Sequence, residues 1–179
     1  MKKSNQTRIP EQAEEPLVEI LDQRARPVAV VTVSEARRQL LPHRSVVVLL
    51  ADDEDRVFLQ RRPAGRGRRL WDASARGALL AGESLGAGAT RILEQATGLH
   101  VERMRLAFEQ APCVENGNEH LHLFQCTRHV GSQAPLEHGQ FYTADEVLFL
   151  MREFRELVAP RFMLLAEASG LFRRPRQLA

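Results

Sequence analysis

The sequence is short of cysteine, of aromatic residues and of net charge, and each shortage disfavours a class of protein. Its two cysteines, Cys113 and Cys126, are too few for a disulfide scaffold and do not form a close metal-binding pair, so we expect reduced thiols. A formal charge of +2 does not by itself indicate a nucleic-acid partner. Aromatic residues make up 6% and do not interleave with basic residues, as they do on single-stranded nucleic-acid surfaces. Nucleic acid is therefore not the expected partner.

Long hydrophobic runs are also missing. No apolar stretch approaches the ~18 residues that a membrane span needs. The charged start, Met1–Lys3, is followed by polar residues rather than by the apolar core of a signal peptide. We therefore expect a soluble, cytoplasmic protein without a membrane partner.

The composition that remains suits one globular domain. The chain has 179 residues, of which 44% are hydrophobic and 27% charged, values typical of a folded domain. We expect residues 1–15 to form a flexible N-terminal tail, 16–170 a single domain and 171–179 a basic C-terminal tail. The sequence leaves the oligomeric state open, including a homo-oligomer.

The pattern of apolar residues predicts strands that alternate with helices. Strands are expected at 17–21, 27–33, 45–50, 57–60, 70–77, 101–111 and 119–127, with a loop at 63–69. A short helix should start at Ser34, and a longer one should run from the N-cap Ser84 to Thr97, closed by Gly98. Two more helices are expected within 143–170, separated near Pro160. This order predicts a layered α/β or α+β domain.

One segment resembles a known family signature. Residues 77–99 read GALLAGESLGAGATRILEQATGL and are similar to the Nudix box. Six residues fall at the family's spacing: Gly77, Glu83, Arg91, Leu93, Gly98 and Leu99. The chain is therefore identified as a member of the Nudix superfamily, over roughly residues 15–165. The resemblance implies the Nudix α/β/α sandwich, with a mixed β-sheet between helices.

The segments around the box resemble the isopentenyl-diphosphate-isomerase-like branch of that superfamily. These segments are His43–Arg44, Leu59–Arg62, Leu70–Asp72 and Asn118–Glu119. The isomerase itself needs a cysteine before the box glycine and a histidine after it, where this chain has Arg76 and Ala78. The first acid of its glutamate–any–glutamate motif is Gly117, although His43 and Glu119 match. We therefore do not expect isomerase activity.

The box helix departs from the family at three positions. The resemblance implies that glutamates on this helix hold Mg²⁺ or Mn²⁺, but their positions are Ile92, Gln95 and Ala96. These positions share one helix face, and magnesium prefers hard oxygen ligands that include carboxylates. Glu94 occupies the family's variable position and should point to solvent. Without the metal, both Lewis-acid and water-activating functions would be lost.

The acids and the arginine that remain are candidates for a weakened site. Glu83, Arg91 and Glu119 stand at positions that the family uses for catalysis, and Glu83 and Glu119 are the remaining candidate metal ligands. In the family the arginine orients neighbouring glutamates, which this helix lacks.

Basic residues and histidines outside the box suggest two further sites. Guanidinium groups match phosphate oxygens, so five arginines could bind a phosphorylated ligand: Arg61, Arg62, Arg66, Arg68 and Arg69. The alternative is an ordinary solvated loop. His120 and His122 alternate on one predicted strand and share a face, with Glu119 facing the other way. They form either a two-histidine metal site or an ordinary histidine pair.

The favoured interpretation is a Nudix-superfamily protein, nominally a hydrolase of diphosphate-linked compounds, with weak or absent catalysis. Its expected partner is a phosphorylated small molecule. One alternative is an active metal-dependent pyrophosphohydrolase with a relocated metal site, built from Glu83, Glu119 and further acidic residues that the sequence does not identify. Another is a non-catalytic scaffold that binds protein or RNA, because a fold alone does not determine function.

Overall fold

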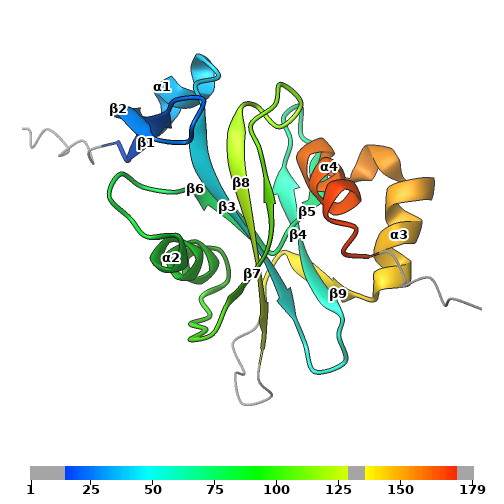
Figure 1. The fold of residues 1–179 in the computed structure, drawn as a ribbon. Helices are drawn as coiled ribbons and strands as arrows, with labels where there is room; N and C mark the ends of the chain where they lie inside the picture. The colour runs from blue at the N-terminus through cyan, green and yellow to red at the C-terminus, as the bar shows by residue number, and fades with distance from the viewer. Residues whose placement is uncertain (1–14, 129–135, 173–179) are drawn as a thin grey trace, which may run out of the picture.

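A mixed β-sheet lies between helices in the computed structural model, which describes residues 15–128 and 136–172. Helix α2 (Leu85–Thr97) covers one face of the sheet, and α3 (Ala144–Glu153) and α4 (Pro160–Ser169) cover the other (Figure 1). This is the expected α/β/α sandwich. The expected N-terminal tail, apart from Glu15, and the basic tail after Phe172 lie outside the described residues.

The central strand is β3 (His43–Ala51). It pairs in parallel with β8 (Glu119–Thr127) along its whole length, from His43 beside Glu119 to Ala51 beside Thr127. It also pairs antiparallel with three strands: β1 (Leu17–Leu21), β4 (Val57–Pro63) and β6 (Ala75–Ala78). The outer strands are β2 (Pro27–Thr32), β5 (Arg69–Asp72), β7 (Arg105–Gln110) and β9 (Gly139–Tyr142).

The Val/Leu run of β3 is buried on both faces, as a strand between two helical layers must be. Its alternate residues enter two separate cores. Val47 and Leu49 pack with residues of α3 and α4, whereas Val46 and Val48 pack with residues of α2. The same alternation in β8 therefore decides which of its side chains face the box helix.

The box helix begins and ends where its capping residues predict. The Ser84 hydroxyl accepts the Ala87 N–H at 3.3 Å, and Gly98 closes the helix with a left-handed φ of 70°. Helix α3 begins at a capping box formed by Thr143 and Glu146. Pro160 starts α4, and a short 3-10 helix, η1 (Arg155–Leu157), precedes it.

Several predicted boundaries were wrong. The predicted loop 63–69 is narrower, because β4 runs to Pro63 and β5 begins at Arg69. The single segment 70–77 is two strands, and β7 covers only 105–110 of the expected 101–111. Strand β9 was not predicted, and the first helix, α1 (Val33–Arg38), starts one residue before Ser34 because Thr32 caps it.

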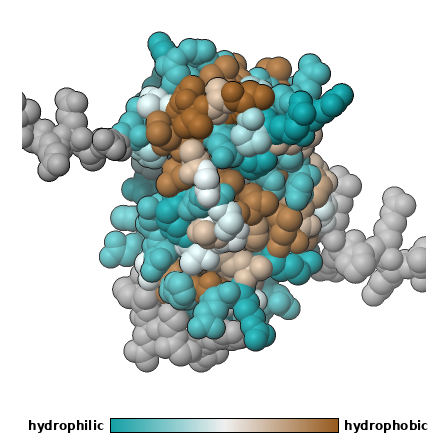
Figure 2. Space-filling view, turned by 60° about the vertical axis from the view of Figure 1, so that its left-hand side comes forward, coloured by the Kyte–Doolittle hydropathy of each residue, from teal (hydrophilic) through white to brown (hydrophobic). Residues whose placement is uncertain are grey.

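No helix in the described part of the chain is long and apolar enough to cross a membrane. An apolar area lies at the upper end of the molecule (Figure 2), where β1, β2 and α1 lie in Figure 1. Val28 and Val30 of β2 are 63% and 53% exposed there, and β2 is an edge strand. Edge strands can pair with another chain, so a homo-oligomer remains a prediction.

Candidate functional site

The loop before α2 carries Glu83, and Arg91 of the helix binds it with two hydrogen bonds. Arg91 Nε lies 2.7 Å from Oε1 and Nη2 lies 2.8 Å from Oε2, while the Leu80 N–H donates to Oε2 at 3.0 Å. The Arg91 hydrogen bonds lower the pKa of the Glu83 carboxyl, and the same bonds raise the pKa of Arg91. Arg91 therefore has a partner outside its own helix. The Glu83 carboxylate is ionised, and the charge of Arg91 compensates its negative charge.

Gly88 lets this loop approach the helix closely. A Cβ at Gly88 would overlap Leu79 Cδ1 and lie 3.1 Å from Glu83 Oε2, whereas a Cβ at Gly86 would meet nothing within 4 Å. A side chain at Gly88 would therefore force the ends of the Leu79 and Glu83 side chains to shift. Gly86 has no such constraint.

The helix face that holds carboxylates in the Nudix box is mostly core in this chain. Ile92 is buried, and a Cβ at Gly77 would lie only 3.1 Å from it. Ala96 is partly buried, and its carbonyl accepts a hydrogen bond from Gln60 Nε2 at 2.8 Å. Gln95 is exposed and accepts from Arg91 Nη1 at 3.3 Å. Glu94 is exposed and 4.0 Å from His100, so none of these side chains presents a carboxylate to the sheet.

Glu119 is buried at the start of β8, and it contacts arginine side chains that are partly exposed. Its Oε2 is 3.2 Å from Arg76 Nη2, and its Oε1 accepts a hydrogen bond from Arg161 of α4. The side chain of Asn116 holds the preceding turn by accepting the N–H groups of Cys113 and Glu119. Among the described residues, Glu83 pairs with Arg91 whereas Glu119 pairs with Arg76 and Arg161, so the two carboxylates have different partners.

Positive charge exceeds negative charge in the group of residues around Glu119. Arg62 Nε is 3.7 Å from Asp72 Oδ2, and Arg76 Nη1 is 4.0 Å from the same oxygen. The group therefore has three guanidinium ions (Arg62, Arg76 and Arg161) and two carboxylates (Asp72 and Glu119). We call these five residues the arginine cluster. Burial is the main cause that lowers the pKa of Arg62, and its Nε and Nη2 are buried without a hydrogen-bond partner among the described residues.

The five arginines expected to bind phosphate do not act together. Arg61 stacks over Trp71 at 5.2 Å from the ring centre. Arg69 donates two hydrogen bonds to the Arg61 carbonyl, at 3.2 and 2.8 Å. Arg66 and Arg68 are exposed on the loop. Of these five, Arg62 alone belongs to the arginine cluster. Arg76 and Arg161 were not predicted as ligands because they are distant in sequence.

The two histidines of β8 lie side by side, as their spacing predicted. Their ring centroids are 4.6 Å apart, and Glu109 of β7 pairs in register with His122. Ligand atoms of Glu109, His120 and His122 all lie within 4.8 Å of one another. Burial is the largest cause that lowers the pKa of His122. Glu109 was not predicted as a member of this group, because the strand register is not visible in the sequence.

The remaining candidate side chains are His43 and the two cysteines, and two of them, His43 and Cys126, are buried in the fold. His43 is fully buried, with Nδ1 2.8 Å from the Leu41 carbonyl oxygen, and its Nε2 has no hydrogen-bond partner among the described residues. Both cysteines are free, Cys126 buried and Cys113 partly exposed. Burial raises the pKa of the Cys126 thiol to about 12, so this thiol is neutral at physiological pH.

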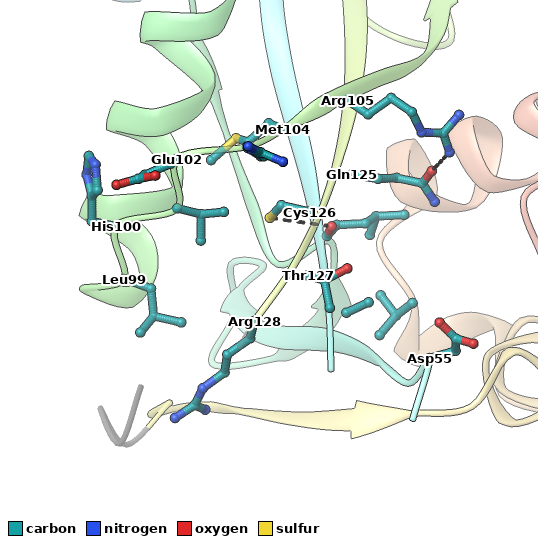
Figure 3. A pocket seen from close by; sticks show the side chains of 15 residues that line it. Asp55, Leu99, His100, Glu102, Met104, Arg105, Gln125, Cys126, Thr127 and Arg128 are labelled. Atoms are coloured by element: carbon teal, nitrogen blue, oxygen red, sulfur yellow. Dashed lines mark hydrogen bonds between the residues drawn. The ribbon is translucent and has the colours of Figure 1, made fainter. Parts of the chain in front are cut away.

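A hollow of about 1050 Å³ lies at the opposite end of the sheet. Figure 3 shows Cys126 and Met104 on its wall, with charged side chains such as Glu102 and Arg128 around it. Its lining includes Ala51 at the end of β3, whereas Glu119 pairs with the first residue, His43. Eight residue steps of a strand span roughly 26 Å. The hollow is therefore separate from the box loop and the arginine cluster.

Comparison with known proteins identifies the same family and the same fold as the sequence and the sheet topology indicate. A family model described as the NUDIX domain matches residues 41–163. A protein from Deinococcus radiodurans, DR0079, superposes with a TM-score of 0.69 at 16% identity, covering 88% of this chain and 99% of that one. A MutT protein from Methanosarcina mazei gives 0.56 at 17% identity, with coverage of 73% and 94%. The E. coli ORF135 protein gives 0.56 at 22% identity, with coverage of 76% and 94%.

At these identities the structural likenesses show a shared fold. No curated protein matches the chain in sequence.

Proposed function

Because this chain belongs to the Nudix family, we propose that it binds a diphosphate-linked compound and hydrolyses it weakly or not at all. The observation that carries the proposal is that the box helix lacks carboxylates at the family's metal-binding positions and that the two remaining carboxylates are paired with arginines. Ile92, Gln95 and Ala96 supply none. The remaining candidates, Glu83 and Glu119, are already bound by arginines.

The family's divalent ion does not fit the residues at this site. Mg²⁺ needs hard oxygen ligands and usually one or two carboxylates. To bind it, Glu83 would have to give up two short hydrogen bonds from Arg91. Glu119 would likewise have to leave Arg76 and Arg161. We therefore derive no catalytic step through a metal ion.

The ligand-binding half of the proposal rests on the arginine cluster. Guanidinium groups bind phosphate oxygens with paired, directional hydrogen bonds. Arg62 has two buried nitrogens without hydrogen-bond partners among the described residues, and three arginines face two carboxylates there. A phosphate group would supply the missing negative charge and acceptors. This revises the expected ligand group from the loop arginines to Arg62, Arg76 and Arg161.

The resemblance to the isomerase branch supports a diphosphate ligand but not isomerase activity. Arg76 occupies the position of the isomerase cysteine and is paired with Glu119. A guanidinium ion cannot replace a thiol in proton transfer, since it remains protonated in proteins. The alternative of a metal site at Glu83 and Glu119 has less support, because each carboxylate binds arginine. The scaffold alternative remains if no small molecule binds.

The test uses inorganic pyrophosphate as the probe. Calorimetry should detect pyrophosphate binding in the presence of a metal chelator, and Arg62→Gln should weaken it at least tenfold, on the order of 1.4 kcal/mol. Arg66→Gln, in the exposed loop, is the matched control and should bind like the wild type.

Turnover is measured separately. Phosphate release from nucleoside and prenyl diphosphates with Mg²⁺ or Mn²⁺ should stay near background. Release at ordinary enzymatic rates would overturn the claim of impaired catalysis. Absence of pyrophosphate binding would overturn the claim of a diphosphate ligand.

A further inference from the structure

A second polar group lies on the face of the sheet that α2 covers. It consists of two histidines of β8 and one glutamate of β7. We propose that Glu109, His120 and His122 bind a transition-metal dication of the zinc type. This cation site is separate from the box helix and does not depend on the proposed diphosphate binding.

The strand geometry brings the three side chains together. His120 and His122 are two residues apart on one strand and therefore point to the same face. Glu109 is the cross-strand partner of His122, and its Oε2 lies 3.9 Å from His120 Nε2. The three ligand atoms lie within 4.8 Å of one another, which is wider than the ~3.3 Å spacing that follows from zinc–ligand bonds of about 2.0–2.1 Å. Binding therefore requires the side chains to move closer together, and Glu109, whose side chain is 49% exposed, has room to rotate.

The surroundings of the histidines favour a ligand. His122 is only 3% exposed. The Nδ1 atoms of both rings are buried and have no hydrogen-bond partner among the described residues. Buried polar atoms are normally satisfied. A cation coordinated through Nδ1 would satisfy these nitrogens, whereas coordination of His120 through Nε2, which lies 3.9 Å from Glu109 Oε2, would leave its Nδ1 unpaired.

The ligand set selects the class of ion. Two imidazoles and one carboxylate suit Zn²⁺ and similar transition metals, whereas Mg²⁺ and Ca²⁺ prefer oxygen ligands alone. Three protein ligands leave a fourth tetrahedral position for water.

This site lies beside the box but is not part of it. His122 is in register with Val46 of β3, and Val46 is in register with Gly77 of β6. Two strand spacings separate His122 from the box glycine, roughly 10 Å. The three proposed ligands belong to β7 and β8, and none is a residue of the box.

Zinc titration of the full chain tests the proposal. Calorimetry of the metal-free protein should show one Zn²⁺ bound per chain, and Co²⁺ should give the intense visible absorption of a tetrahedral site. Glu109→Gln and His120→Ala should each weaken zinc binding at least tenfold. His100→Ala, which removes an exposed histidine next to Glu94, and Cys113→Ser should leave it unchanged.

Melting of the metal-free variants separates loss of binding from loss of fold. Glu109 is half exposed, so Glu109→Gln should melt like the wild type without metal, and zinc should raise the melting temperature of the wild type more than that of Glu109→Gln. Wild-type protein that binds no zinc, or a folded Glu109→Gln variant with unchanged affinity, would overturn the proposal. Pyrophosphate binding is a separate measurement, so either proposal can fail while the other stands.

Discussion

At the scale of single residues, the acidic side chains of the site, Glu83 and Glu119, are paired with arginines. Glu83 and Arg91 both match the Nudix spacing, and the structure joins them through two hydrogen bonds. In a box helix with three glutamates, the arginine would have competing partners. In this helix Gln95 is the only polar neighbour that it contacts, at 3.3 Å. The box loop is therefore joined to the helix by an ion pair.

The pair should make stability depend on pH. The folded-state pKa of Glu83 lies below the ordinary value of a glutamate, chiefly because Arg91 donates hydrogen bonds to its carboxylate. Its contribution is therefore complete above the unfolded pKa and is lost as the pH falls through the folded pKa. Glu83→Gln should lower the free energy of unfolding at pH 7 by about 1–3 kcal/mol. The gap between wild type and variant should shrink below about pH 4.5. Urea denaturation from pH 3 to 8 measures this gap, and a constant gap would contradict the assignment.

Two glycines of α2 provide a matched test of packing. Gly88→Ala should lower the free energy of unfolding by about 1–3 kcal/mol, because the new Cβ overlaps Leu79. Gly86→Ala has open space around the new methyl group and should raise it by about 0.5–1 kcal/mol, since alanine is the better helix former. Thermal melting of the two variants measures both values. Equal effects would show that Gly88 is not required for loop packing.

At the scale of elements, the face of α2 determines whether a box ion can bind. The double variant Gln95→Glu/Ala96→Glu restores two carboxylates without changing the buried Ile92. It should bind Mn²⁺ more tightly than the wild type, by at least tenfold, because carboxylates are the ligands that such ions prefer. Calorimetry measures the affinity, and Glu94→Asp is the control because Glu94 is exposed and off this face. An active enzyme with a relocated metal site would gain nothing from the double variant.

Elements with strong local signals were predictable, and those defined by distant pairing were not. Ser84 and Gly98 mark the ends of α2 in the sequence, and the period of apolar residues marks β3 and β8. Strand β9 has little local signal; it exists because it pairs with β4. The same reason limits the site. The contacts of Glu119 with Arg76 and Arg161, and of Glu109 with the histidines, depend on strand register and helix placement.

At the scale of the whole molecule, the arginine cluster joins separate parts of the fold. Arg62 comes from β4, Asp72 from β5, Arg76 from β6, Glu119 from β8 and Arg161 from α4. Glu119 is therefore bound to one residue of the sheet and to one of the C-terminal helix. A buried ion pair adds little over an apolar pair, but removing one partner leaves the other charge uncompensated.

Glu119→Gln should therefore destabilise the whole domain. It leaves three guanidinium ions around one carboxylate, and we expect a loss of about 3 kcal/mol. For a domain of this size that loss corresponds to a fall in melting temperature of roughly 6–12 °C. Glu94→Gln, on the exposed face of α2, should change stability by less than about 0.5 kcal/mol. Pyrophosphate should raise the melting temperature of Glu119→Gln more than that of the wild type, because it supplies the charge that the variant lacks. An unchanged melting temperature would show that Glu119 does not hold the cluster together, and an unchanged response to pyrophosphate would place the anion elsewhere.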